Sequence, residues 1–219
     1  MKKLILCCIL LSGSLFSMEY FSNENSSLLP STFETKKLED ILDEDCVYQD
    51  TICAHSRTLS DISALVTHEK FKENVVRKIT VMSFKNNLIS SVPKEISRFE
   101  NVVHLDLSYN QLKEIPDSIS ALTNLTNLNL EHNQIVRLPT SLSTLENLAI
   151  LLLSHNRLTE IPSLVDCKKL EIFEAANNKL VTLCNENGEL LLPVGIWLCN
   201  IDNNNIPTNE MQLLKQKSN

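Results

Sequence analysis

Apolar and polar positions recur along the middle of the chain in a unit of 23 residues. From Val102 to Asn124 the unit is V-V-H-L-D-L-S-Y-N-Q-L-K-E-I-P-D-S-I-S-A-L-T-N, and residues 125–147 repeat it without a gap. Four further copies keep the same apolar positions, at residues 79–101, 148–169, 170–195 and, in part, 196–206. A period of this length indicates a stacked repeat architecture, in which each copy buries its apolar face against the next.

Each copy predicts one short strand followed by a return segment. The L-x-L alternation places both leucines on one face of a strand, which we assign to the interior. Ile115, Ile119 and Leu122 of the second copy fill that interior from the return segment. A proline recurs after the strand and bars a strand or helix from continuing there. Six such strands, spaced about 4.8 Å apart, form a sheet about 25–30 Å wide.

An asparagine stands at one fixed place in every copy, where the chain turns off the strand. The six are Asn87, Asn110, Asn133, Asn156, Asn178 and Asn204. An amide side chain carries both donors and an acceptor, so it can satisfy backbone groups of neighbouring turns that water does not reach. We therefore interpret the series as a structural ladder and not as a row of ligand-binding side chains.

The consensus L-x-x-L-x-L-x-x-N-x-L resembles the leucine-rich repeat family over residues 79–206. The resemblance implies an α/β solenoid, with a curved parallel sheet on the concave side and an irregular or helical return on the convex side. The second half of the unit resembles the subclass found in intracellular scaffolds that contact small GTPases and in bacterial repeat proteins. Bacterial ubiquitin-ligase effectors add a large catalytic domain to such repeats; because this chain ends after its repeats, we expect no such activity.

The outward strand positions are polar in the early copies and largely apolar in the later ones. The later positions that we predict to bind a partner are Ile150, Leu152, Ile172, Glu174, Leu198 and Asn200. An exposed apolar cluster with a polar rim is typical of a protein interface, so we expect a protein or peptide to bind here. The alternative is that a convex loop or the C-terminal lid folds over the cluster. Trp197 is one position out of phase and is expected to lie partly in the core.

Residues 1–17 have the pattern of an export signal. Lys2 and Lys3 precede an apolar stretch, and Ser17 offers a cleavage point. The apolar stretch is shorter than the roughly 20 residues that a helix needs to span a bilayer. We expect a secreted or periplasmic protein with no stable membrane insertion after cleavage. The alternative is an apolar helix that stays attached to a cytoplasmic protein.

The segments on either side of the repeats do not repeat. In residues 18–78, Ser31 and Glu34 have the spacing of a helix capping box, and residues 61–78 carry apolar side chains at helical spacing. We expect a flexible lead-in and a helical N-terminal cap over the first repeat, because repeat arrays need caps. An independent helical function is the alternative. At the other end, residues 207–219 are expected to form a short C-terminal helical lid.

Charge and composition exclude several classes of function. The net charge of −7, spread over the chain, argues against nucleic acid as a partner. The three glycines fit no nucleotide-binding loop, so no cofactor is expected. His132 and His155 occupy equivalent places and should stack at the sheet edge, but no converging ligands indicate a metal. The seven cysteines form no C-x-x-C pair, and we interpret most of those outside the leader as buried apolar side chains.

These features predict an exported, non-enzymatic module that binds a protein or peptide on its concave sheet, directed at a host or neighbouring cell. The main alternative is an intracellular leucine-rich-repeat scaffold or regulator of a small GTPase or phosphatase. A third is an accessory subunit of an enzyme whose chemistry lies in a partner. The sequence leaves the partner, the biological process, the oligomeric state and the disulfide state of the cysteines open.

Overall fold

The computed structural model describes residues 36–37, 47–48, 50–55, 58–63, 65, 68 and 71–217, and the structural statements below concern these residues. They belong to one compact unit that covers residues 35–219. The predicted leader at residues 1–17 and the capping-box residues Ser31 and Glu34 lie outside the described residues.

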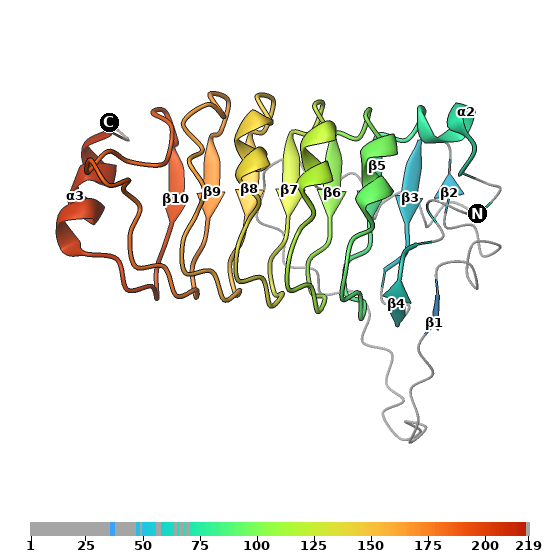
Figure 1. Ribbon diagram of the computed structural model, residues 1–219, viewed down its shortest axis with the longest axis horizontal. Helices are drawn as coiled ribbons and strands as arrows, with labels where there is room; N and C mark the ends of the chain where they lie inside the picture. The colour runs from blue at the N-terminus through green and yellow to red at the C-terminus, as the bar shows by residue number, and fades with distance from the viewer. Residues whose placement is uncertain are drawn as a thin grey trace, which may run out of the picture. The chain divides into compact units, whose positions relative to one another are not determined.

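Seven parallel strands of the described chain lie side by side in one sheet (Figure 1). In chain order they are β3 (Thr51–Cys53), β5 (Val81–Ser83), β6 (His104–Asp106), β7 (Asn127–Asn129), β8 (Ile150–Leu152), β9 (Ile172–Glu174) and β10 (Leu198–Asn200). Each strand pairs with the next without a register shift, so that Leu105, Leu128 and Leu151 are neighbours. Equivalent positions of the copies therefore form rows across the sheet.

Two short strands complete the pairing at the N-terminal end. β2 (Val47–Tyr48) runs antiparallel to β3 at the edge of the large sheet. β1 (Lys36–Lys37) and β4 (Leu59–Asp61) form a separate two-stranded parallel pair. The edge of β3 is thereby covered by β2, as an otherwise unpaired sheet edge requires.

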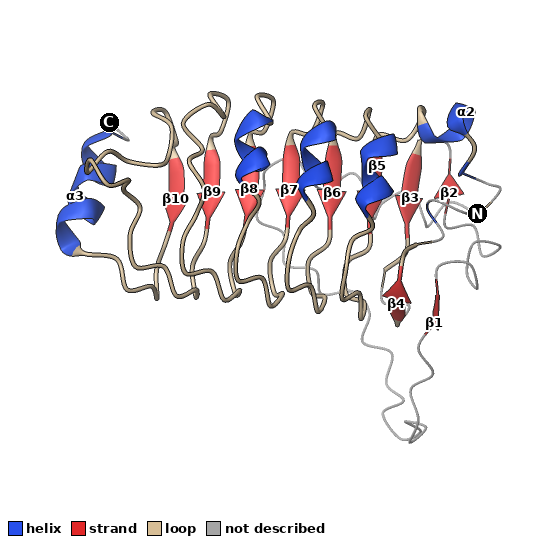
Figure 2. Ribbon diagram, in the orientation of Figure 1, coloured by secondary structure: helices blue, strands red, loops and turns tan. Residues whose placement is uncertain are grey.

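The return segments of three copies contain short 3-10 helices (Figure 2). These are η3 (Lys94–Arg98), η4 (Asp117–Ala121) and η5 (Thr140–Thr144). Each follows a proline in extended conformation, at position 93, 116 or 139, whose ring ends the preceding extended segment. Each helix buries one side chain, Ile96, Ile119 or Leu142.

The core lies between the strands and the return segments. Leu105, Leu128 and Leu151, from the middle of their strands, are at most 2 % exposed, and they share one cluster with the buried residues of the 3-10 helices. Burying one such side chain stabilises the fold by about 1.5–3 kcal/mol. Because the cluster continues from copy to copy, each copy is stabilised by its neighbours. The predicted solenoid with a parallel sheet is confirmed.

The helical N-terminal cap expected within residues 18–78 is not confirmed. β3 pairs in parallel with β5, and Ile52, Ala54 and Leu59 are fully buried in the core. The described part of the segment holds the helix α2 (Glu73–Val76), which is only four residues long. Apolar residues three or four apart suit a helix, but they also suit the return segment of a repeat. The sheet therefore begins one copy before residue 79.

The described chain ends in helix α3 (Thr208–Lys217), within the segment where a helical lid was expected. Glu210 anchors it, because its Oε2 accepts a hydrogen bond of 2.6 Å from the backbone N–H of Leu183. Both Glu210 carboxylate oxygens lie 3.0 Å from the Thr182 hydroxyl, which donates to them. Met211 and Leu214 pack against the core. No helix among the described residues has the length and apolar character needed to cross a membrane.

Candidate binding surface

The asparagine ladder holds adjacent copies in fixed relative positions. Asn133 Oδ1 accepts a hydrogen bond of 2.9 Å from the Leu112 N–H. Its Nδ2 donates to the carbonyl oxygens of Leu107 at 3.0 Å and Leu130 at 3.1 Å. Equivalent bonds are made by the other members, Asn87, Asn110, Asn156, Asn178 and Asn204. Since these amides are engaged inside the stack, the side chains that the sheet presents to solvent are the outward ones of the strands.

A row of side chains borders the sheet where the chain leaves each strand. Its members precede the ladder asparagines and have a left-handed backbone with φ between 52° and 59°: Asn86, Tyr109, His132, His155, Asn177 and Asn203. The rings of Tyr109, His132 and His155 stack with centroids 4.1 Å apart. Asn177 Nδ2 lies 3.3 Å from His155 Nε2 and continues the row. The two histidines are therefore stacked neighbours, and the described residues contain no cluster of three or more metal-ligating side chains.

The apolar patch consists of Ile150, Leu152, Ile172 and Leu198. Ile150, Ile172 and Leu198 lie in one row of the sheet, because they are paired residues of β8, β9 and β10. Ile150, Leu152 and Ile172 are half-buried, and Leu198 is 37 % exposed. The patch is therefore open to solvent in the described part of the chain.

The polar residues predicted to rim the patch lie in the adjacent row. Leu152 pairs with Glu174, and Glu174 pairs with Asn200. Both polar side chains are half-buried. Asn200 Oδ1 accepts a hydrogen bond of 3.2 Å from the Asp202 N–H, so this side chain also closes the turn after β10. The register thus brings all six predicted residues together on one sheet face.

The sequence analysis placed Trp197 partly in the core, and this prediction is wrong. Trp197 is 66 % exposed and lies next to the apolar patch, directly before Leu198. Strand alternation does not apply to it, because β10 begins one residue later. The position equivalent to Trp197 in β9's copy is Glu171, an exposed charged residue. That charge was the sequence signal that this position faces solvent.

Carboxylates surround the patch on the side of the strand ends. Burial is the main cause that raises the pKa of Glu131, and the negative charges of Glu174 and Asp106 raise it further. Lys85 acts in the opposite direction. The Lys85 ammonium group lies 5.5 Å from the centre of the Tyr109 ring, beside the turn after β6 and outside the patch. The sheet face near the patch is thus negative as well as apolar.

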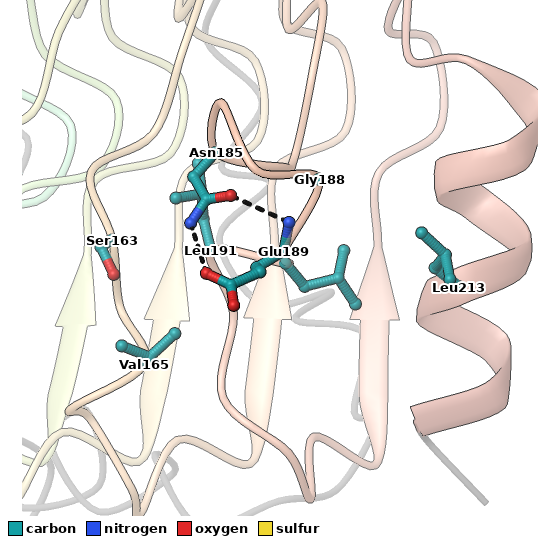
Figure 3. Close-up of a pocket in the computed structure, with 8 residues that line it drawn as sticks. Ser163, Val165, Asn185, Gly188, Glu189, Leu191 and Leu213 are labelled. Atoms are coloured by element: carbon teal, nitrogen blue, oxygen red, sulfur yellow. Dashed lines mark hydrogen bonds between the residues drawn. The ribbon is translucent and has the colours of Figure 1, made fainter.

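A separate hollow of about 520 Å³ lies beside the turn at Asn185, on the side of the return segments (Figure 3). Leu213 lines it from α3, and Val165 lines it from an earlier copy. Asn185 Nδ2 donates to Glu189 Oε2 at 2.8 Å, and Asn185 Oδ1 accepts from the Glu189 N–H at 2.9 Å. In a small-molecule site, polar groups converge on the cavity. Here these polar groups bond to each other instead.

The thiols of Cys167 and Cys199 are not activated as nucleophiles. Neither forms a disulfide, and Cys46 lies outside the described part of the chain. Burial, with a smaller contribution from Asp166, raises the pKa of Cys167 to about 11, and burial raises the pKa of Cys199 to about 12. Such thiols remain protonated near neutral pH and are poor nucleophiles.

The repeat geometry agrees with the comparison to known families, in which residues 77–135 match the family model described as leucine rich repeat. Residues 77–135 of this chain are leucine-rich repeats. A leucine-rich-repeat protein of Leptospira interrogans is 22 % identical to it, with a TM-score of 0.62 over 85 % of this chain and 51 % of the other. This leucine-rich-repeat chain thus spans about half the length of that protein.

Two further solved structures show the same fold. The LRIM1/APL1C complex is 20 % identical, with a TM-score of 0.59 over 68 % of this leucine-rich-repeat chain and 26 % of the other. The plant peptide hormone receptor RGFR1 in complex with RGF2 is 28 % identical, with a TM-score of 0.51 over 62 % and 24 % respectively. This chain therefore spans about a quarter of each of those two proteins. A comparison with curated proteins gave no significant match.

Proposed function

We propose that this leucine-rich-repeat protein is a non-enzymatic module that binds a protein or peptide on the outward face of β8, β9 and β10. The observation that carries the proposal is the apolar patch, which remains partly exposed on an otherwise well-packed sheet. An exposed contiguous apolar patch marks an interaction site more often than not, because soluble proteins rarely leave one uncovered. The ladder keeps the strands in place, so binding requires little ordering of the protein.

The solved relatives support this class of function. One of them is a plant peptide hormone receptor in complex with RGF2, and another is the LRIM1/APL1C complex. Leucine-rich-repeat proteins are in general interaction modules without enzymatic activity. We extend the binding of a protein or peptide from these structures to the present chain as part of the proposal.

The binding surface is tested with the double substitution Leu152→Asp and Ile172→Asp. Both side chains are half-buried at the sheet surface, so the fold should survive while two charges are placed in the apolar patch. The matched control is Val136→Asp with Val181→Asp, because these apolar residues are 44 % and 55 % exposed and lie outside the strands. Circular dichroism verifies that both variants are folded.

Affinity capture from the native source, read by mass spectrometry, compares the three proteins. We expect partners that are captured by the unchanged protein and by the Val136 and Val181 control, but not by the Leu152 and Ile172 variant. Capture of the same partners by all three would place binding elsewhere and refute the proposed surface.

We further propose that the protein is exported, and this proposal is supported by the signal-like pattern of residues 1–17. The test is the intact mass of the native protein, recovered separately from cytosol, cell envelope and medium. A mass that lacks about 17 residues, found in the envelope or medium, is the expected result. A full-length mass in the cytosol would refute export and favour the intracellular scaffold or regulator of a small GTPase or phosphatase.

A further inference from the structure

We propose that the surface on β8, β9 and β10 takes a cationic partner, namely a peptide or protein segment in which Lys or Arg stands beside apolar side chains. This inference rests on the proposed function, because it names the chemistry of the partner for the same surface. Three observations carry it: the arrangement of carboxylates around the apolar patch, the shortage of cations on the same face, and the exposed ring of Trp197.

Carboxylates adjoin the apolar patch at both ends of its strands. Glu174 is the paired neighbour of Leu152 across β8 and β9, so its carboxylate borders the patch directly. Asp202 follows β10 and is exposed. At the opposite strand end, the exposed Glu171 follows the exposed Lys168 and Lys169, and its carbonyl oxygen accepts a hydrogen bond of 3.1 Å from the Trp197 N–H. A partner lying across the patch therefore meets net negative charge where the strands end, at Glu174 and Asp202.

Positive charge on this face is scarce. Among the described residues of β5 to β10 and the turns after them, the outward carboxylates are those of Asp106, Glu131, Glu174 and Asp202, and the outward cation is Lys85. Lys85 lies over the ring of Tyr109, which follows β6, and β7 separates β6 from β8. The ion pairs seen in the described chain, Arg77 with Glu73 and Arg137 with Glu160, are formed by exposed side chains outside these strands.

The carboxylates also affect one another. Glu174 and Asp106 raise the pKa of the half-buried Glu131, which means that these negative charges are close enough to repel. A partner cation placed among them reduces that repulsion. In a partly desolvated setting this attraction is stronger than between charges fully in water.

Lys and Arg side chains match both parts of the surface. Their aliphatic stems can lie along Ile150 and Leu152 while the charged ends reach the carboxylates of Glu131 and Glu174. The ring of Trp197, 66 % exposed, offers a face for a cation–π contact or for an apolar side chain. An acidic partner would instead meet repulsion from Glu131, Glu174 and Asp202 where the strands end.

Peptide selection provides a test that does not presuppose the partner. Short random peptides displayed on phage are selected on the immobilised full chain, and the enriched sequences are synthesised. Trp197 is the single tryptophan of the protein, so its fluorescence reports binding at the patch in solution. We expect enriched peptides with Lys or Arg beside apolar residues, with few Asp or Glu, and a change in Trp197 fluorescence on binding.

The double variant Glu131→Gln with Glu174→Gln measures the contribution of charge. We expect affinity for the selected peptides to fall about tenfold or more, and the salt dependence of binding to weaken, because two attractive charges are removed without a change in side-chain size. The control, Glu114→Gln with Glu146→Gln, makes the same change in net charge at exposed residues of the return segments and should leave affinity unchanged within about twofold. Unfolding curves verify that both variants are folded.

The outcomes separate this inference from the proposed function. Neutral or acidic peptides that lose binding in the Leu152 and Ile172 variant would overturn the cationic inference and leave the proposed surface intact. Cationic peptides bound equally by both glutamine variants and the unchanged protein would indicate general attraction to an acidic protein, and would also overturn it. Selected peptides that are indifferent to the Leu152 and Ile172 variant would overturn both proposals.

Discussion

The sheet has two halves that share an interior but differ in their outward face. In β6 and β7 the last outward residue closes its own turn: Asp106 Oδ1 accepts from the Ser108 N–H at 2.9 Å, and Asn129 Oδ1 accepts from the Glu131 N–H at 3.0 Å. In β8 the same position is Leu152, whose side chain cannot form such a bond. In β6 and β7 these outward groups thus bond to their own backbone, as Asn200 does after β10, whereas the side chain of Leu152 remains available for a partner.

The inward positions show no such difference. Leu105, Leu128, Leu151 and Phe173 occupy the same row and are all at most 2 % exposed. The ladder amides make the same bonds in both halves. Each copy thus contributes the same buried residues and ladder bonds to stability, while its outward residues can change without disturbing the stack. Four experiments test this difference between the interior and the outward face.

The largest effect is expected from Asn133→Ala in the ladder. Removal of the amide leaves the Leu112 N–H unpaired in the interior, and an unsatisfied buried group costs about 1–3 kcal/mol. It also removes one hydrogen bond each from the Leu107 and Leu130 carbonyl groups, which keep their bonds from Asn110 and Asn156, at about 1 kcal/mol per lost bond. We expect the free energy of unfolding to fall by about 4 kcal/mol in urea titrations. The control is Asn129→Ala, an outward asparagine on β7 in the same copy. It should lower the free energy of unfolding by about 1 kcal/mol. Equal losses in the two variants would contradict a structural ladder.

Two adjacent leucines of β8 compare the interior with the face directly. Leu151 is fully buried and Leu152 is half-buried. We expect Leu151→Ala to lower the free energy of unfolding by about 3 kcal/mol, since it opens a cavity, and Leu152→Ala to lower it by less than about 1 kcal/mol. Partner binding should respond in the opposite order. If Leu152→Ala lowered the free energy of unfolding as much as Leu151→Ala does, Leu152 would belong to the core.

An exchange of outward residues between β7 and β8 tests whether the face is independent of the fold. Ile150→Asn with Leu152→Asn gives β8 the outward residues of β7. We expect the affinity for the selected peptides to fall about tenfold, while the free energy of unfolding changes by less than about 1 kcal/mol. The reverse exchange, Asn127→Ile with Asn129→Leu, extends the apolar patch by one strand. Peptide affinity that does not change in the first variant would show that the apolar row is not the binding surface.

The smallest effect concerns the ring stack beside the polar half and its response to pH. Burial, together with the charges of His155 and Lys85, lowers the pKa of His132 in the folded protein. The unfolded chain therefore binds a proton more readily, so stability falls as the pH drops from about 7.5 to about 5.5. Since the ring remains partly exposed to solvent, which screens its charge, this contribution should stay below about 1 kcal/mol.

His132→Asn tests this contribution, because asparagine occupies the same left-handed position in other copies, at Asn86 and Asn177. The variant should lose less stability on acidification than the unchanged protein. Tyr109→Asn keeps the histidine but removes a ring that helps to bury it, and should weaken the pH dependence only in part. The pH dependence includes His104, whose pKa is lowered by burial, and Glu131, whose pKa is raised, but both variants retain these groups.

The sequence was sufficient for the repeated part of the fold, because a core position that returns in every copy is visible as a spacing. The first strand of the sheet was missed because its copy is irregular. Ile52, Ala54 and Leu59 fit the repeat, but Arg57 stands in the sequence where later copies have asparagine. Only the pairing of β3 with β5 shows that this segment continues the sheet.

The candidate surface was partly predictable for a related reason. Outward positions follow from alternation within a strand, so Ile150, Leu152, Ile172 and Leu198 could be grouped. Trp197 could not, because where β10 begins depends on backbone pairing. The mutual influence of Glu131 and Glu174 was also hidden, since these residues are 43 positions apart in the sequence and meet only through the stacking of copies.

The uninterrupted register of β5 to β10 has a consequence for how such a protein can change over evolution. Besides its own copy, each ladder asparagine bonds only to the copy before it. A complete unit such as residues 125–147 therefore carries the amide that joins it to the preceding copy. Recombination that duplicates or deletes one complete unit keeps every join intact and changes the width of the sheet by about 4.8 Å. A loss or gain of residues between a strand and its ladder asparagine would leave buried backbone groups without their counterparts, whereas the return segments tolerate such changes, as the copies at residues 148–169 and 170–195 show. The width of the sheet therefore changes by whole copies, whereas the outward residues of its strands can be substituted one at a time.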